Sequence, residues 1–90
     1  MTAPTTVGRG GGNNIALQDA ACSSSHAKIR YEANEEGEQL FVIYDMASSN
    51  GLFVGAKEDY KNETSRTYRR ALADGDYLLI GETTLVFKKI

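Results

Sequence analysis

Short apolar runs separated by turn-forming residues recur along the whole chain. The clearest run follows His26, where Ala27, Ile29 and Tyr31 alternate with charged residues. A period of two is typical of a β-strand with one solvent-facing side. No segment has the 3.6-residue period of an amphipathic helix. Besides 27–32, strands are predicted at 5–7, 15–17, 40–44, 52–54, 67–72, 77–80 and 83–87.

Turn signals lie between these strands. Asn50-Gly51 separates two β-prone runs, and both residues adopt positive φ at little cost. Further turns are predicted at 10–14, 34–38, 73–76 and 81–82, and residues 55–66 are predicted to form a long surface loop with one irregular turn. Roughly seven to nine short strands without a helix predict an all-β fold, a β-sandwich of mainly antiparallel strands.

The length of 90 residues predicts a single domain over residues 1–90, with residues 1–6 as a lead-in. The chain has 12 acidic and 10 basic residues, and this balance argues against a general nucleic-acid binder. No apolar run approaches the ~20 residues that span a bilayer, and no signal region is visible at the N-terminus. No membrane association is therefore expected.

Cys22 and His26 are the only cysteine and the only histidine. One cysteine cannot form an intramolecular disulfide, so a cytoplasmic, reducing location is expected. One cysteine and one histidine cannot build a His/Cys metal site within the chain. The glycine-rich run 10–14 lacks the Gly-Lys-Ser/Thr of a nucleotide-binding loop, so neither a metal nor a cofactor is predicted.

Small polar residues gather in three places: Gly8-Arg9, the run from Ser23 to His26, and the loop from Asp45 to Gly51. Together with a later Leu72-x-Asp74-Gly75-Asp76 turn and Ile80-Gly81, these motifs resemble the forkhead-associated (FHA) domain. That family is a β-sandwich, grouped with SMAD-like folds, that binds phosphothreonine peptides. The resemblance covers residues 7–88 and rests on the ordered set of motifs.

The resemblance implies a binding surface in the loops at one end of the sandwich. Its peptide-contacting residues would be Arg9, Ser23, Ser24, Ser49 and Asn50, and its supporting residues would be Gly8, His26, Asp45 and Gly51. A guanidinium and hydroxyl groups are good partners for phosphate oxygens, at about 1.5–3 kcal/mol for each charge-assisted bond. An Asn amide both donates and accepts, which suits a peptide backbone.

The sequence departs from the family pattern at three places. Many members have Arg or Asn where this chain has Ser24, and an Asn where it has Gly55. Only seven residues precede Gly8, so we expect this sequence to lack the first strands of the family. By resemblance, the first strand would pair with the last one. Its absence predicts an exposed edge at 84–87, and we expect this edge to self-associate or to pair with another segment.

Three functions compete. The expected function is non-catalytic recognition of a phosphothreonine-containing partner, the product of a Ser/Thr protein kinase. The alternative is an FHA-fold scaffold that has lost phosphate binding and assembles through another surface. An enzyme would use Cys22 or a serine with His26 and Asp45, but so small a sandwich leaves little room for a substrate cleft, and no catalysis is expected.

Overall fold

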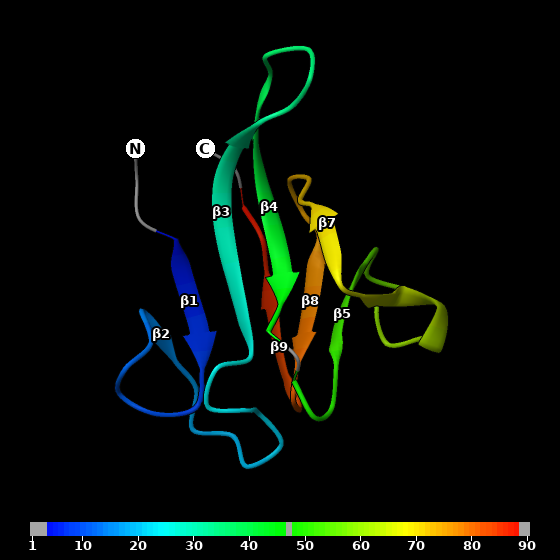
Figure 1. Cartoon of the computed structure of the whole chain (residues 1–90). Coiled ribbons are helices and arrows are strands. Elements are labelled where there is room, and N and C mark those ends of the chain that lie inside the picture. Colours follow the sequence, from blue (N-terminus) through cyan, green and yellow to red (C-terminus); the bar gives the residue numbers. More distant parts are fainter. Residues whose placement is uncertain (1–3, 47, 89–90) are drawn as a thin grey trace.

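The chain folds as a sandwich of two β-sheets, shown in Figure 1 as a computed structural model that describes residues 4–46 and 48–88. The strands are β1 (Thr5–Gly8), β2 (Ile15–Ala16), β3 (Ala27–Ala33), β4 (Gln39–Asp45), β5 (Leu52–Gly55), β6 (Arg66–Thr67), β7 (Arg69–Ala71), β8 (Tyr77–Ile80) and β9 (Thr83–Val86). One 3-10 helix, η1 (Glu63–Ser65), precedes β6. Within the described residues, no helix is long and apolar enough to cross a membrane.

The sheets have the strand orders β2-β1-β3-β4-β7 and β6-β5-β8-β9. Neighbouring strands are antiparallel except β1 and β2, which run parallel. The predicted all-β sandwich is therefore confirmed. The long β3–β4 pair lies inside the five-stranded sheet, and its strands pair over all seven residues of each.

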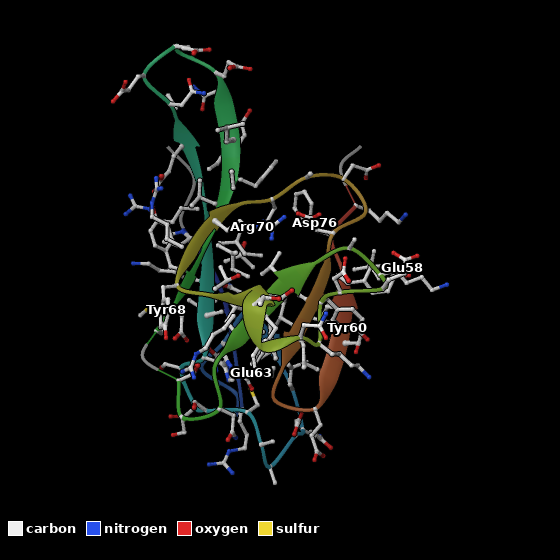
Figure 2. The ribbon with its side chains drawn as sticks, turned by 90° about the vertical axis from the view of Figure 1, so that its right-hand side faces the viewer. Glu58, Tyr60, Glu63, Tyr68, Arg70 and Asp76 are labelled. Carbon is white, nitrogen blue, oxygen red and sulfur yellow. The ribbon has the colours of Figure 1, made fainter. Side chains whose placement is uncertain are left out.

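The predicted single edge strand over residues 67–72 is wrong, because this segment forms two strands in different sheets. β6 pairs with β5 in the four-stranded sheet, and β7 pairs with β4 in the five-stranded sheet. The chain changes sheets at Tyr68, which is 66% exposed. Arg70 then links the sheets through a 2.9 Å hydrogen bond from Nη1 to the Val54 carbonyl. Both Tyr68 and Arg70 lie on the side shown in Figure 2.

The core lies between the two sheets. Ile43 of β4 is fully buried, as are Leu52 and Val54 of β5 and Ile80 of β8. Burying one such side chain contributes about 1.5–3 kcal/mol, so the facing strands hold the layers together. This core fixes where each strand ends, and hence where the connecting loops lie.

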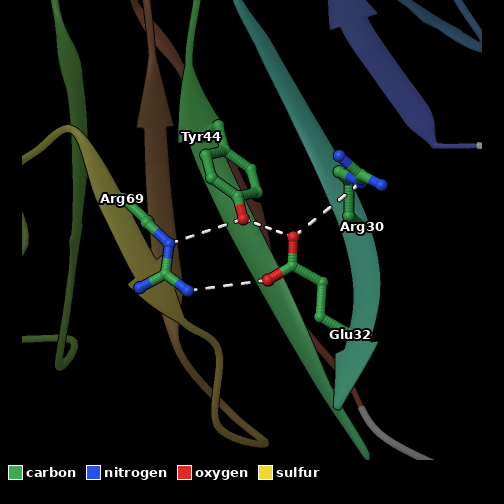
Figure 3. Close-up of polar contacts among 4 residues, drawn as sticks. All are labelled: Arg30, Glu32, Tyr44 and Arg69. Carbon is green, nitrogen blue, oxygen red and sulfur yellow. Dashed lines mark hydrogen bonds and ion pairs between the residues drawn. The ribbon is translucent and has the colours of Figure 1, made fainter. Parts of the chain in front are cut away.

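The outer face of the five-stranded sheet carries a polar cluster (Figure 3). Glu32 accepts a hydrogen bond from the Tyr44 hydroxyl and lies 3.8 Å from Arg30 Nε and 3.5 Å from Arg69 Nη2. Lys28 and Arg69 flank the Tyr44 ring, at 5.5 and 5.6 Å from its centroid. Exposed ion pairs of this kind contribute little stability, so the cluster mainly orders the surface of β3, β4 and β7.

The connection between β5 and β6 lies over the outer side of the four-stranded sheet (Figure 2). Tyr60 packs on Tyr77 with ring centroids 5.2 Å apart, and its hydroxyl lies 3.0 Å from Thr84 Oγ1. The loop predicted at 55–66 is shorter at both ends. Gly55 is the last residue of β5 and pairs with Tyr77 of β8, and Arg66 is the first residue of β6. The predicted lead-in is shorter too, because β1 begins at Thr5; residues 1–3 lie outside the described residues.

Candidate functional site

Three loops and a turn gather at one end of the sandwich, the lower end in Figure 1. They are the loops 9–14, 17–26 and 46–51 and the β8–β9 turn. The ends of β1, β4 and β8 place them there, so segments far apart in sequence become neighbours. Every site residue predicted from the sequence lies in these loops or at the strand ends that carry them.

Gly8 and Arg9 are attached directly to the serine loop. The Arg9 N–H donates to the Ser23 carbonyl at 2.9 Å. A Cβ at Gly8 would lie 2.3 Å from the Ser24 carbonyl oxygen, so only glycine allows this approach. Asn13 Nδ2 donates to the same carbonyl at 2.8 Å. The Arg9 side chain is exposed and makes no hydrogen bond or ion pair with any residue in 4–46 or 48–88.

His26 is fully buried and joins two loops through its ring nitrogens. The Ser23 N–H donates to Nδ1 at 3.0 Å, and Nε2 lies 2.7 Å from the Gly51 carbonyl oxygen. A backbone N–H can only donate and a carbonyl can only accept, so the proton must sit on Nε2. The neutral imidazole therefore satisfies one group from each loop and fixes their spacing.

Ser23, Ser49 and Asn50 form a second link between the same loops. The Ser49 N–H donates to Ser23 Oγ at 3.1 Å, which leaves the Ser23 hydroxyl hydrogen available to another acceptor. Asn50 Nδ2 donates to the Ala21 carbonyl at 2.6 Å. Ser49 and Asn50 are exposed, as is Ser24. The Asn50 side chain thus braces the loops while it faces solvent.

Asp45 and Gly51 shape the loop that carries Ser49 and Asn50. Asp45 Oδ1 accepts from the Ser48 N–H at 3.2 Å and from Ser48 Oγ at 2.5 Å, a side-chain turn that closes the start of the loop. Gly51 has φ of 84°, and a Cβ there would lie 3.0 Å from Arg66 Nε. The backbone conformation therefore favours glycine at the loop's end, and a larger residue would also have to displace the Arg66 side chain.

Asp19 links the loop 17–26 to the β8–β9 turn. Its Oδ2 accepts from Thr83 Oγ1 and the Glu82 N–H, both at 2.7 Å, and its Oδ1 accepts from the Ala21 N–H at 2.9 Å. The Thr83 hydroxyl, followed by the two backbone donors, lowers the pKa of Asp19. The carboxylate therefore holds two remote segments in place.

Cys22 is buried in the same loop and is poorly placed for nucleophilic chemistry. Burial raises the pKa of its thiol, as does the charge of Asp19, while Arg9 acts in the opposite direction. Its Sγ lies 3.4 Å from the Ser23 carbonyl oxygen. Both ring nitrogens of His26 already bind backbone groups, so the imidazole is not positioned as a base for this thiol. Within the described residues, no three His, Cys, Asp or Glu side chains group as metal ligands.

Sequence reasoning missed three residues that support the site. Asn13 lies in the predicted turn 10–14 and Arg66 in the predicted surface loop 55–66, while the sequence predicts no role for Asp19. Each acts on a partner distant in sequence, namely Ser24, Thr83 and Gly51. The available signal was the position of Asn13 and Asp19 among small residues, where amide and carboxylate groups commonly bind backbone.

Comparison with known proteins identifies the family. The sequence pattern of the FHA domain matches residues 5–81. This chain belongs to the FHA domain family. The resemblance inferred from Gly8-Arg9, the Ser23–His26 run and the Asp45–Gly51 loop is therefore confirmed.

Similar proteins come from a plant and from bacteria. An FHA domain-containing protein of Arabidopsis thaliana is 35% identical over 75 residues, which cover 83% of this chain and 17% of that protein. The glycogen accumulation regulator GarA of Mycobacterium tuberculosis is 34% identical over 83 residues, which cover 92% of this chain and 43% of GarA. The chain thus spans less than half the length of either relative.

Solved structures also match. Mycobacterium tuberculosis EmbR, solved with a low-affinity phosphopeptide, superposes with a TM-score of 0.73 at 30% identity, over 96% of this chain and 20% of EmbR. An FHA domain structure from a study of phosphothreonine-dependent interactions superposes with a TM-score of 0.79 over 100% of this chain and 80% of that one. At 23% identity, that second likeness bears on the fold alone.

Proposed function

We propose that this FHA domain recognises phosphothreonine-containing protein segments, with Arg9, Ser23, Ser24, Ser49 and Asn50 as its contact residues. The phosphate would meet the Arg9 guanidinium and the hydroxyl groups of Ser23 and Ser49. Asn50 would bind the peptide backbone beside the phosphothreonine. Ser24, which replaces a longer donor of many family members, would add a weak contact.

One observation carries this proposal: hydrogen bonds link the loops that hold Arg9, Ser23 and Ser49 to one another, while Arg9 and Ser49 are exposed and Ser23 is partly exposed. The Arg9 N–H binds the Ser23 carbonyl, and the Ser49 N–H binds Ser23 Oγ. The loop backbones and the Ser23 hydroxyl group therefore need little ordering when an anion arrives, whereas the exposed Arg9 side chain still has to be ordered.

The energetics are consistent with modest affinity. A micromolar Kd needs about 8.2 kcal/mol. A few charge-assisted bonds at about 1.5–3 kcal/mol each, together with backbone contacts from Asn50, reach this value after ordering costs. The net charge of -2 opposes an anionic ligand at long range, so Arg9 has to act at short range.

We further propose that the domain acts without catalysis, inside the cell, on the product of a Ser/Thr protein kinase. The buried Cys22 thiol and the backbone-bound His26 ring support a structural role for both residues. EmbR, at 30% identity, was solved with a phosphopeptide, which supports the same ligand class here.

Calorimetric titration with matched phosphothreonine, phosphoserine and unphosphorylated peptides tests the proposal. The phosphothreonine peptide is expected to bind, and Arg9→Ala should weaken it by about 2 kcal/mol, roughly thirtyfold. Arg30→Ala is the matched control, because it removes the same charge from the outer face of β3, away from the loops. Equal affinity for phosphorylated and unphosphorylated peptides would contradict the proposal.

A scaffold that has lost phosphate binding is the second candidate. The observation in its favour is the outer edge of β9, to which no other strand of the described residues pairs. Such a scaffold would show no phosphate-dependent titration with any peptide and would still assemble through that edge.

A further inference from the structure

A row of basic and aromatic side chains crosses the outer face of the five-stranded sheet next to the site loops. Lys28 of β3 pairs with Tyr44 of β4, and Tyr44 pairs with Arg69 of β7. Residues directly opposite each other in a sheet lie on the same face, so these three side chains form one row. The row adjoins the loops, because Lys28 follows His26 by two residues and Tyr44 directly precedes Asp45.

Arg66 and Tyr68 extend this row to the β4–β5 loop. The Tyr68 carbonyl accepts a hydrogen bond from the Asp45 N–H at 2.9 Å, and Arg66 Cζ lies 5.5 Å from the centroid of the Tyr68 ring. Three atoms of the Arg66 side chain lie 3.0–3.3 Å from the position of a Cβ at Gly51, so the guanidinium borders the loop. Row and extension together form the basic band, which consists of Lys28, Tyr44, Arg66, Tyr68 and Arg69.

The basic band presents side chains that are typical of protein interfaces. Tyr68 is 66% exposed, and the Arg69 side chain is 64% exposed. Met46, which directly follows β4, is 42% exposed. Tyrosine and arginine are enriched among the residues that dominate binding energies, and exposed apolar groups beside them add contact area. The band therefore has the composition of an interaction surface.

The basic band is positive although the whole chain has a net charge of -2. Within the described residues, its only ion pair joins Arg69 Nη2 to Glu32 at 3.5 Å. Lys28 and Arg66 instead lie over the tyrosine rings of the band as cation–π pairs, which leave their charges unneutralised. The glutamates of the turn 34–38 lie at the opposite end of β3 and β4. This separation of charge makes the band attractive to an acidic ligand.

We infer that the basic band binds an acidic segment of the phosphorylated partner, beside the phosphothreonine. The inference rests on the proposed function and adds a sequence class to its ligand. The loop that holds Ser49 and Asn50 ends at Gly51 beside Arg66, so a peptide that leaves the loop on this side passes over Tyr68. The strands of the row span about 10 Å, and an extended peptide advances about 3.3 Å per residue. Four consecutive acidic residues therefore reach across the row.

Calorimetric titration with phosphothreonine peptides of one core sequence tests the inference. The peptides carry four glutamates before the phosphothreonine, four after it, or glutamines at both places. A bound peptide runs in one direction, so only one flank lies over the band. That glutamate flank should lower Kd by about tenfold at low salt, and the gain should vanish near about 0.5 M salt. Equal gains from both flanks, or no gain from either, would overturn the inference.

Charge variants locate the effect. Arg69→Gln and Lys28→Gln should each reduce the gain by about threefold and leave the affinity for the glutamine-flanked peptide unchanged. Lys61→Gln is the matched control, because Lys61 also lies over a tyrosine ring, 5.6 Å from the centroid of Tyr60. Figure 2 shows Tyr60 and Tyr68 on opposite sides of the view. An equal loss in Lys61→Gln would overturn the assignment to the band.

Charge reversal and two other probes complete the test. Arg69→Glu should make the peptide with a lysine flank bind more tightly than the peptide with a glutamate flank. Phosphate-dependent binding without any flank preference would overturn this inference alone, whereas binding that ignores the phosphate would overturn the proposed function as well. A dimer seen in sedimentation, or a bound single-stranded oligonucleotide, that Arg69→Gln weakens without a flank effect would assign the band to another occupant and overturn the inference.

Discussion

Two turns of this domain are built from the same local parts and differ in what surrounds them. In the turn between β3 and β4, Asn34 Oδ1 accepts from the Glu36 and Glu38 N–H groups, both at 2.9 Å. In the β4–β5 loop, Asp45 Oδ1 accepts from the backbone and hydroxyl of Ser48. Each contains a glycine at positive φ, 83° for Gly37 and 84° for Gly51.

Among the residues that the structure describes, the β3–β4 turn forms hydrogen bonds only within itself, whereas the β4–β5 loop forms hydrogen bonds to neighbouring loops. In the β4–β5 loop, the Gly51 carbonyl is hydrogen-bonded to the His26 ring. The Ser49 N–H donates to Ser23 Oγ, and the Asn50 side-chain amide donates to the Ala21 carbonyl. A self-contained turn only reverses the chain. A loop bonded to other loops holds donors at fixed positions, which is what recognition of a ligand needs.

The two glycines give the largest contrast between these turns. Gly37→Val should cost about 1–2 kcal/mol, the price of a left-handed backbone, because nothing lies within 4 Å of its added Cβ. Gly51→Val should cost about 3 kcal/mol or more, since the same strain is joined by the contact with Arg66 and by burial. Urea unfolding of the three proteins measures both changes.

Equal losses of unfolding free energy in the two glycine variants would contradict the comparison. They would mean that Arg66 moves aside at no cost and that the β4–β5 loop is as independent as the β3–β4 turn. Arg66→Ala combined with Gly51→Val separates the two contributions, because it removes the contact and leaves the backbone strain.

The two asparagines give a smaller contrast in stability and a larger one in function. Asn50→Ala removes one exposed hydrogen bond to Ala21 and should cost about 1 kcal/mol of unfolding free energy. It should also abolish detectable phosphopeptide binding, because the amide is the proposed backbone contact. Asn34→Ala should cost a similar amount and leave peptide affinity unchanged. Thermal unfolding and calorimetric titration check both.

A different outcome would reassign Asn50. If Asn50→Ala lowered the unfolding free energy as far as Gly51→Val does, its bond to Ala21 would be its main role. Retained peptide affinity in the same variant would remove Asn50 from the contact residues altogether.

The sequence predicted what depends on neighbours in the chain. Alternation around Ala27 and Ile29 located β3, and Asn50-Gly51 located the turn before β5. It did not predict the change of sheet at Tyr68, because alternation reports which face a residue takes and not which strand it pairs with. For this reason the sequence predicted a single strand over residues 67–72.

The family resemblance predicted the contact residues of the candidate site. It did not predict the hydrogen bonds that hold their loops together. Asp19 and Thr83 are 64 residues apart, and Ser49 and Ser23 are 26 apart. No local pattern reports a pairing over such separations. By resemblance, β9 was expected at the edge of its sheet, and among the described residues it is the last strand of the four-stranded sheet.

The smallest expected effect concerns the tie between Asp19 and the β8–β9 turn, for which the β3–β4 turn has no counterpart. The Thr83 hydroxyl and backbone donors hold the pKa of Asp19 below its ordinary value of 3.8. A carboxyl whose folded pKa is lowered stabilises the fold above its unfolded pKa. That contribution is lost as the pH falls through the folded pKa. Asp19→Asn should therefore be less stable than wild type at pH 7, and the gap should close toward pH 2.

Thr83→Val completes a double-mutant cycle for this tie, since it removes the first of the donors to Asp19. In wild type, it should reduce the pH-dependent part of the unfolding free energy, because the lowered pKa depends on that hydroxyl. In Asp19→Asn it should change the pH dependence little. A stability gap between wild type and Asp19→Asn that stayed constant from pH 7 to pH 2 would show that the charge of Asp19 does not hold these two segments together.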